Sequence, residues 1–115
     1  MELLPAVTAA MMGNVDVSAQ VILQLTGDFD RTTVVYQCEQ IPDPLKVVFI
    51  NAKPNFLALV PVGPQTMVFV NVTSASGAKY VAGQYELWTK GSEATLTDLE
   101  ADPQSVNCSA VNDTP

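Results

Sequence analysis

The stretch LKVVFINAKPNFLALVPVGPQTMVFVNV, residues 45–72, decides the fold class. It contains three runs rich in β-branched and aromatic residues, namely 45–51 (LKVVFIN), 56–61 (FLALVP) and 65–72 (QTMVFVNV). Such side chains suit a pleated, half-buried surface. The turn residues Lys53-Pro54-Asn55 and Gly63-Pro64 separate the runs, where a proline removes no hydrogen bond from a β-ladder. This stretch therefore predicts three consecutive strands.

The same pattern extends on both sides of this stretch. Five further runs follow the same rule: 21–26 (VILQLT), 33–39 (TVVYQCE), 79–82 (KYVA), 84–89 (QYELWT) and 93–99 (EATLTDL). Eight short strands at this spacing are typical of an all-β sandwich or barrel. Antiparallel strands that close on themselves remove exposed sheet edges. We therefore predict an all-β fold, a small eight-stranded antiparallel β-barrel whose interior is filled by side chains.

The length of 115 residues suits one domain. We assign residues 21–115 to a single barrel domain and set residues 1–20 apart. The apolar start MELLPAVTAAMMG resembles a signal-peptide core but lacks the basic region that precedes one, since Glu2 is its only charge. Residues 1–20 are therefore a signal remnant, an artificial addition or a genuine N-terminal arm. No run of 18 apolar residues predicts a membrane-spanning segment.

Composition excludes several classes of function. The chain has no histidine, which removes Ser-His-Asp and Cys-His nucleophile systems and His-ligated zinc or haem. No motif for a metal or a cofactor appears, and we expect neither. The net charge of −7 is opposite to that of a nucleic-acid binder and favours a basic protein partner. We interpret the acidic pairs, such as Asp28 with Asp30, as solvated surface, and we expect no enzyme activity.

The two cysteines, Cys38 and Cys108, form either a structural disulfide or two separate buried thiols. We predict the disulfide, because the pair stands alone and Cys108 lies close to the C-terminus. Its loop of about 70 residues corresponds to roughly 4.4 kcal/mol of stabilisation in the chain-entropy estimate. An oxidising compartment follows from this pairing.

Large aromatic residues are usually buried, so we expect Trp88, Tyr80 and Tyr85 to lie in the core. The sharper feature is the segment 74–96, SASGAKYVAGQYELWTKGSEATL, in which a loop of small residues precedes a predicted hairpin. Lys79 and Lys90, two of only five basic residues, flank that hairpin. This pattern is also compatible with ordinary turns that carry solvated lysines.

The residues 76–80 (SGAKY), 88–91 (WTKG) and 93–96 (EATL) resemble the bacterial inhibitors of c-type lysozyme, the MliC/PliC family. The resemblance extends over most of residues 34–108. It implies an eight-stranded antiparallel barrel with one disulfide. It also implies insertion of two loops into the lysozyme cleft, with the inserting serine at Ser76 and the inserting lysine at Lys90. Gly77 and Gly91 would permit the turns, and Tyr80 would support the first loop.

The resemblance further implies a basic c-type lysozyme as the partner and an exported, periplasmic location in a Gram-negative bacterium. We see no lipoprotein cysteine near the N-terminus, so this chain gives no support to a lipid anchor. Two other functions stay open: a secreted structural or adhesive β-module, and a small lipocalin-like carrier, which would need a ligand cavity. The oligomeric state is open as well, a homodimer included.

Overall fold

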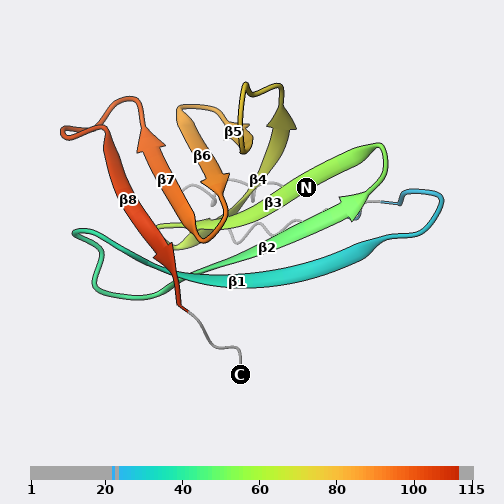
Figure 1. The fold of residues 1–115 in the computed structure, drawn as a ribbon, viewed down its shortest axis with the longest axis horizontal. Coiled ribbons are helices and arrows are strands. Elements are labelled where there is room, and N and C mark those ends of the chain that lie inside the picture. The colour runs from blue at the N-terminus through green and yellow to red at the C-terminus, as the bar shows by residue number, and fades with distance from the viewer. Residues whose placement is uncertain (1–21, 23, 112–115) are drawn as a thin grey trace, which may run out of the picture.

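The computed structural model describes residue 22 and residues 24–111. Eight antiparallel strands close into one barrel in chain order, with β8 returning to pair with β1 (Figure 1). The strands are β1 (Asp30–Cys38), β2 (Leu45–Ala52), β3 (Asn55–Val62), β4 (Gln65–Val72), β5 (Ala78–Ala82), β6 (Tyr85–Lys90), β7 (Glu93–Asp98) and β8 (Ser105–Ala110). The predicted all-β barrel is confirmed.

One predicted strand is wrong and one real strand was missed. The described positions within 21–26 are not a strand; Ile22 is 78% exposed and Leu25 is 44% exposed. The missing eighth strand is β8, where polar Ser105, Asn107 and Ser109 alternate with inward apolar residues. The β8 strand pairs with β7 on one side and with β1 on the other, so it completes the ring without the 21–26 run.

Apolar side chains that point inward from the strands form the core of the barrel. Its fully buried members include Val47, Val60, Phe69 and Leu87, which come from β2, β3, β4 and β6. Tyr80 and Tyr85 pack against this cluster, as expected. Trp88 does not, and that expectation was wrong: Leu87 points inward, so the next residue along β6 lies on the outer face.

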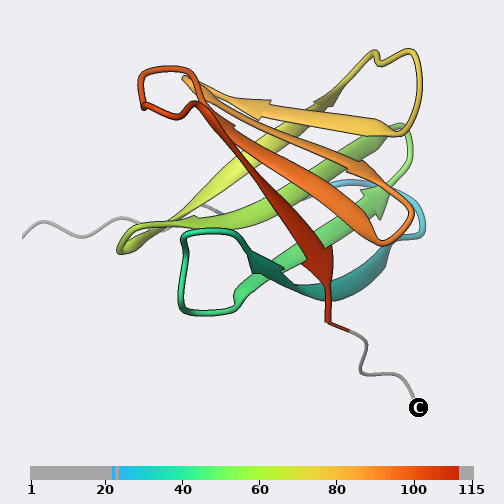
Figure 2. The same cartoon turned by 60° about the vertical axis from the view of Figure 1, so that its left-hand side comes forward.

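The ring has two narrow seams. β1 and β8 pair through three residues of each strand, and β4 and β5 also pair through three, whereas β1 and β2 pair through seven. Figure 2 shows the long strands β1–β4 crossing the shorter strands β5–β8. The barrel is thus two four-stranded sheets joined at two short seams.

The predicted disulfide joins Cys38 of β1 to Cys108 of β8. The two residues are directly opposite each other in the ladder, with their Cα atoms 4.0 Å apart. The bond therefore lies on the β1–β8 seam.

Candidate functional site

The loop between β4 and β5, residues 73–77, is a short run of small side chains. The Ser74 hydroxyl donates a hydrogen bond to the Ser76 carbonyl oxygen at 2.7 Å. Gly77 then takes a φ of 67°, a left-handed conformation that a residue with a Cβ adopts only with strain. Ser76, which lies between these two features, is exposed.

Trp88 of β6 attaches this loop to the barrel. Its indole N–H donates to the same Ser76 carbonyl at 2.9 Å. At the next residue the backbones come so close that a Cβ on Gly77 would overlap the Thr89 carbonyl oxygen. The glycine therefore serves two purposes, a positive φ and a close approach to β6. The loop is held against one strand by a hydrogen bond and by packing.

Lys90, the last residue of β6, lies beside this loop. A Cβ on Gly77 would be 3.3 Å from the Lys90 Cβ, so positions 77 and 90 are in contact. The Lys90 side chain is exposed, and Gly91, with φ 60°, turns the chain towards β7. Within the described part of the chain, Lys90 has no salt-bridge partner. The other lysine of the hairpin, Lys79, lies 3.8 Å from the Glu86 carboxylate.

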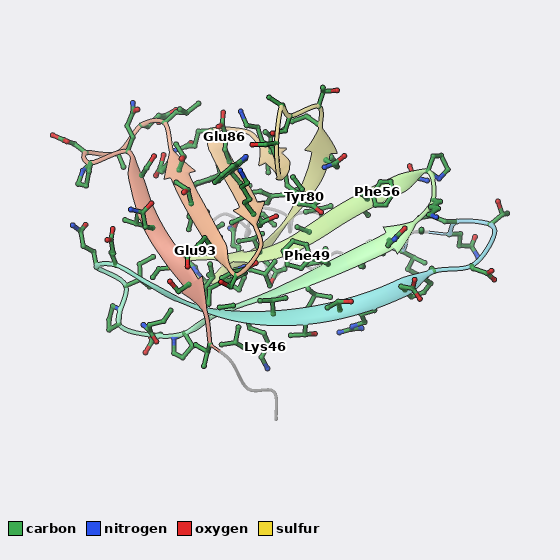
Figure 3. The ribbon with its side chains drawn as sticks, in the orientation of Figure 1. Lys46, Phe49, Phe56, Tyr80, Glu86 and Glu93 are labelled. Carbon is green, nitrogen blue, oxygen red and sulfur yellow. A yellow bond between two sulfur atoms is a disulfide. The ribbon has the colours of Figure 1, made fainter. Side chains whose placement is uncertain are left out.

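Tyr80 faces the barrel interior beneath the same loop. Its ring packs against Phe49 of β2 with centroids 5.5 Å apart, and both side chains are labelled in Figure 3. Together with Ser74 and Gly77, Tyr80 lines a hollow below the loop. Burial raises the pKa of Tyr80, so its phenol stays neutral and packs as an uncharged ring.

Four of the five residues that the sequence singled out, Ser76, Gly77, Lys90 and Gly91, thus lie at one end of β5 and β6, where β5 begins and β6 ends. Tyr80 lies in the middle of β5, opposite Leu87, and reaches the loop only through the hollow that it lines with Ser74 and Gly77. The contribution of Trp88 was not predicted from the sequence. The signal was present, because Tyr85 and Leu87 share the inward face of the 84–89 run and leave Trp88 on the other face.

The chemistry at this end of the barrel is that of recognition. Exposed Ser76 and exposed Lys90 lie in neighbouring segments, and among the described residues Lys90 has no salt-bridge partner; a hydroxyl and an ammonium are both groups that can bind a carboxylate. Over residues 24–111, no three His, Cys, Asp or Glu side chains gather as a metal site would require. The described residues also include no helix that is long and apolar enough to cross a membrane.

Comparison with known proteins places the chain in a family. The profile of the family described as membrane-bound lysozyme-inhibitor of c-type lysozyme matches residues 36–105. A relative of that name from Pseudomonas aeruginosa is 50% identical over 98 residues, which are 80% of this chain and 76% of the relative. Another, from Cupriavidus necator, is 40% identical over 85 residues, or 70% of this chain and 67% of the relative.

A solved structure agrees with these two sequences. The crystal structure of Pseudomonas aeruginosa MliC in complex with hen egg white lysozyme is 46% identical to this chain. It superimposes with a TM-score of 0.69 and covers 83% of this chain and 100% of the other. The profile match spans β2 to β7 completely and includes the Ser76 loop and the Lys90 turn, whereas most of β1 and of β8 lies outside it. The chain belongs to the family of membrane-bound inhibitors of c-type lysozyme.

Proposed function

We propose that this protein inhibits c-type lysozyme by inserting the Ser76 loop and the Lys90 turn into the active-site cleft of the enzyme. The observation that carries the proposal is the close approach of positions 77 and 90, which brings the loop with Ser76 next to Lys90, a lysine without a salt-bridge partner among the described residues. The family relatives are named as inhibitors of this enzyme, and one was crystallised in complex with it.

Two effects would stop catalysis. Lysozyme needs one carboxyl group protonated as the general acid and a second one ionised. An ammonium close to these groups favours their charged forms and lowers their pKa values, which removes the acid. The inserted loops also occupy the space of the sugar substrate. The protein then acts as an inhibitor and has no catalytic residues of its own.

The long-range charge favours the encounter. The chain carries a net charge of −7, and c-type lysozymes are strongly basic, so the two proteins attract each other before contact. An exported protein of the Gram-negative periplasm fits this role, because that compartment supports the Cys38–Cys108 bond.

The decisive experiment replaces Lys90 with alanine and uses Lys79→Ala as the matched control. Both variants lose one positive charge, so surface attraction to a basic enzyme rises equally in the two. Lys79 is already paired with Glu86. Lys90 has no salt-bridge partner among the described residues, so its ammonium can enter the lysozyme cleft without breaking an ion pair described here. Loss of one partner of a desolvated ion pair costs roughly 2–5 kcal/mol of binding, mostly through faster dissociation.

Binding to a c-type lysozyme is measured by titration calorimetry, and inhibition by the turbidity of lysing cell walls. We expect Lys90→Ala to bind far more weakly and Lys79→Ala to bind as well as the unaltered protein. Ser76→Ala should lose about 0.5–1.5 kcal/mol, the contribution of one hydroxyl hydrogen bond. Equal or tighter binding by Lys90→Ala would refute insertion. A complete lack of inhibition by the unaltered protein would favour the structural or adhesive module instead.

A further inference from the structure

The end of the barrel remote from Lys90 contains a cavity of about 480 Å³. The β6 strand begins at Tyr85 on the cavity and ends at Lys90, so the two ends are roughly 17 Å apart along the strand. The cavity is therefore separate from the surface assigned to lysozyme. Its volume lies within the usual range of small-molecule sites, about 300–1,000 Å³.

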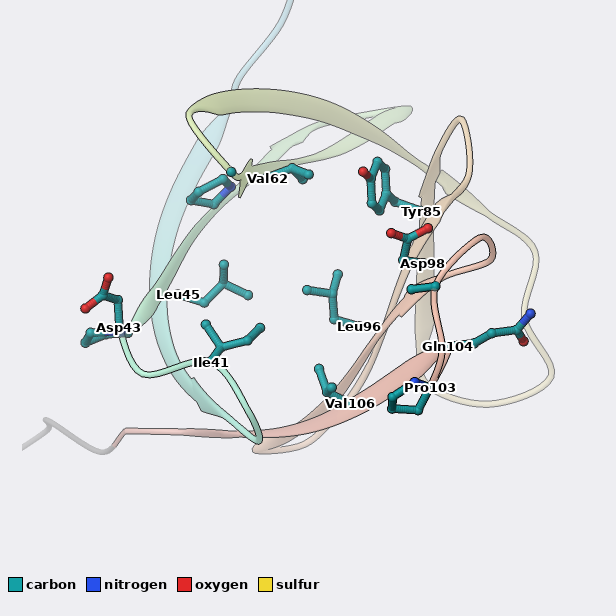
Figure 4. A pocket seen from close by; sticks show the side chains of 14 residues that line it. Ile41, Asp43, Leu45, Val62, Tyr85, Leu96, Asp98, Pro103, Gln104 and Val106 are labelled. Carbon is teal, nitrogen blue, oxygen red and sulfur yellow. The ribbon is translucent and has the colours of Figure 1, made fainter.

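The walls of the cavity are mainly apolar. Figure 4 shows side chains from segments far apart in the sequence, such as Ile41, Val62 and Val106, around one opening. The apolar side chains and the tyrosine that converge there are Ile41, Leu45, Val62, Tyr85, Leu96 and Val106. Such a lining binds a compact hydrocarbon or aromatic group by removing its surface from water.

Among residues 24–111, the charged residues that line the cavity are two carboxylates, Asp43 and Asp98. Asp98 is half-buried and fixed in place. Its Oδ1 atom accepts hydrogen bonds from Gln84 Nε2 at 2.8 Å and from the backbone N–H of Glu100 at 3.0 Å. These two bonds to Oδ1 fix the orientation of the carboxylate, and neither uses Oδ2. None of the described residues that line this cavity is a lysine or an arginine.

The rim beside Asp98 is also held by backbone bonds. The Asp98 N–H donates to the Gln104 carbonyl at 2.8 Å, and the Ala101 N–H donates to the Asp98 carbonyl at 3.0 Å. Gln104 Nε2 donates to the Leu99 carbonyl at 3.0 Å. The mouth is thus formed in advance, so a ligand would not have to order it on binding.

We propose that this cavity binds a small amphiphilic cation, a compact apolar body that carries one ammonium group. The apolar body fits between Leu96, Val62 and Val106, and the ammonium pairs with the preoriented Asp98 carboxylate. An anionic ligand of the same shape is disfavoured, because it would face two carboxylates with no compensating cation in the lining. This site is independent of lysozyme inhibition.

The test compares two probes of matched shape, 2-phenylethylammonium and the neutral 2-phenylethanol, on the full-length protein. Binding is followed by amide chemical shifts in ¹H–¹⁵N spectra. We expect saturable shifts around Leu96 and Val106, with the ammonium binding about tenfold more tightly than the alcohol, the effect of one charge-assisted hydrogen bond. Equal affinities for the two probes, or no saturable shifts at this end, would overturn the proposal.

Two variants then locate the site. Asp98→Asn keeps an oxygen that can accept the Gln84 and Glu100 bonds but removes the charge, so it should lower ammonium affinity to that of the alcohol. Leu96→Phe places a larger ring in the cavity and should weaken both probes. Unchanged ammonium binding by Asp98→Asn would refute the assigned contact. Lysozyme inhibition is measured in parallel for each variant. It should be unchanged, because the cavity lies at the end of the barrel away from Ser76 and Lys90.

Discussion

Replacement of Gly77 by alanine separates the two reasons for a glycine in the Ser76 loop. The first is conformational, since φ is 67° and an alanine in that region is strained by roughly 1–2 kcal/mol. The second is steric, because the new methyl group would overlap the Thr89 carbonyl oxygen and touch Lys90 Cβ and Trp88 Cε2, each at 3.3 Å. The overlapping atom belongs to the backbone of β6 and cannot rotate away.

Gly83 is the matched control for this change. Its φ is 56°, so Gly83→Ala introduces a comparable backbone strain, but a Cβ there has no atom within 4 Å. Overpacking of a close contact typically costs a further ~1–3 kcal/mol. Gly77→Ala should therefore be destabilised by about 1–3 kcal/mol more than Gly83→Ala. The displaced loop should also move Ser76 away from Trp88.

The assay is urea unfolding of both variants, followed by lysozyme inhibition under conditions where both are folded. We expect Gly77→Ala to lose stability and affinity together, and Gly83→Ala, at the other end of the hairpin, to retain its affinity. Equal losses of stability in the two variants would show that the close approach of Gly77 to Thr89 adds nothing to the cost of the substitution. Full inhibition by folded Gly77→Ala would refute the role of loop position.

Four further outcomes test other parts of the structure. Trp88→Phe keeps a ring but removes the donor to Ser76, so lysozyme should dissociate several-fold faster, about 1 kcal/mol in affinity, as measured by surface plasmon resonance; an unchanged rate would contradict this positioning. The double variant Cys38→Ala with Cys108→Ala should lose up to about 4.4 kcal/mol of the free energy of unfolding in urea, because the bond closes a loop of 70 residues. An unchanged free energy of unfolding would show that the disulfide does not stabilise the fold. Burial, and then the charge of Tyr80, raise the pKa of Tyr36, so the Tyr36 contribution to the free energy of unfolding should be fully present below pH 10 and be lost as the pH rises through the raised pKa. Tyr36→Phe should reduce this loss of stability in urea unfolding measured at several pH values. An unaltered pH dependence in the variant would contradict the assignment to Tyr36. Truncation to a chain that begins at Val21 should leave inhibition intact, since residues 1–20 lie outside the family match; a folded but inactive truncation would prove the opposite.

The strand runs could be located from sequence because each is a local pattern. Residues 45–51, 56–61 and 65–72 combine β-branched side chains with proline and glycine turns, and all three correspond to strands. The 21–26 run has the same local pattern, yet its described positions stay outside the sheet. A strand also needs a partner edge, and β8 already pairs with β1 at the position where the ring closes.

The placement of a side chain inside or outside the barrel could be predicted only where the alternation of residues between the two faces of a strand was taken into account. Size alone assigned Trp88 to the core, whereas the inward positions of Tyr85 and Leu87 put it outside. Its bond to the Ser76 carbonyl joins positions twelve residues apart, and no local pattern encodes that contact. The proposed roles of Ser76 and Lys90 came from the family resemblance, and the structure adds their proximity and the pairing of Lys79 with Glu86.

The two narrow seams are the places where the fewest paired residues hold the barrel closed. One seam, between β1 and β8, is crossed by the Cys38–Cys108 bond, and the other, between β4 and β5, ends at the loop that carries Ser76. Reduction would leave the first seam with three paired residues and two flanking backbone bonds, from Glu39 N–H to the Asn107 carbonyl and from Val111 N–H to the Val35 carbonyl. Local opening of the reduced barrel should therefore begin at this seam, and hydrogen exchange of the β1 and β8 amides should rise before that of the other strands.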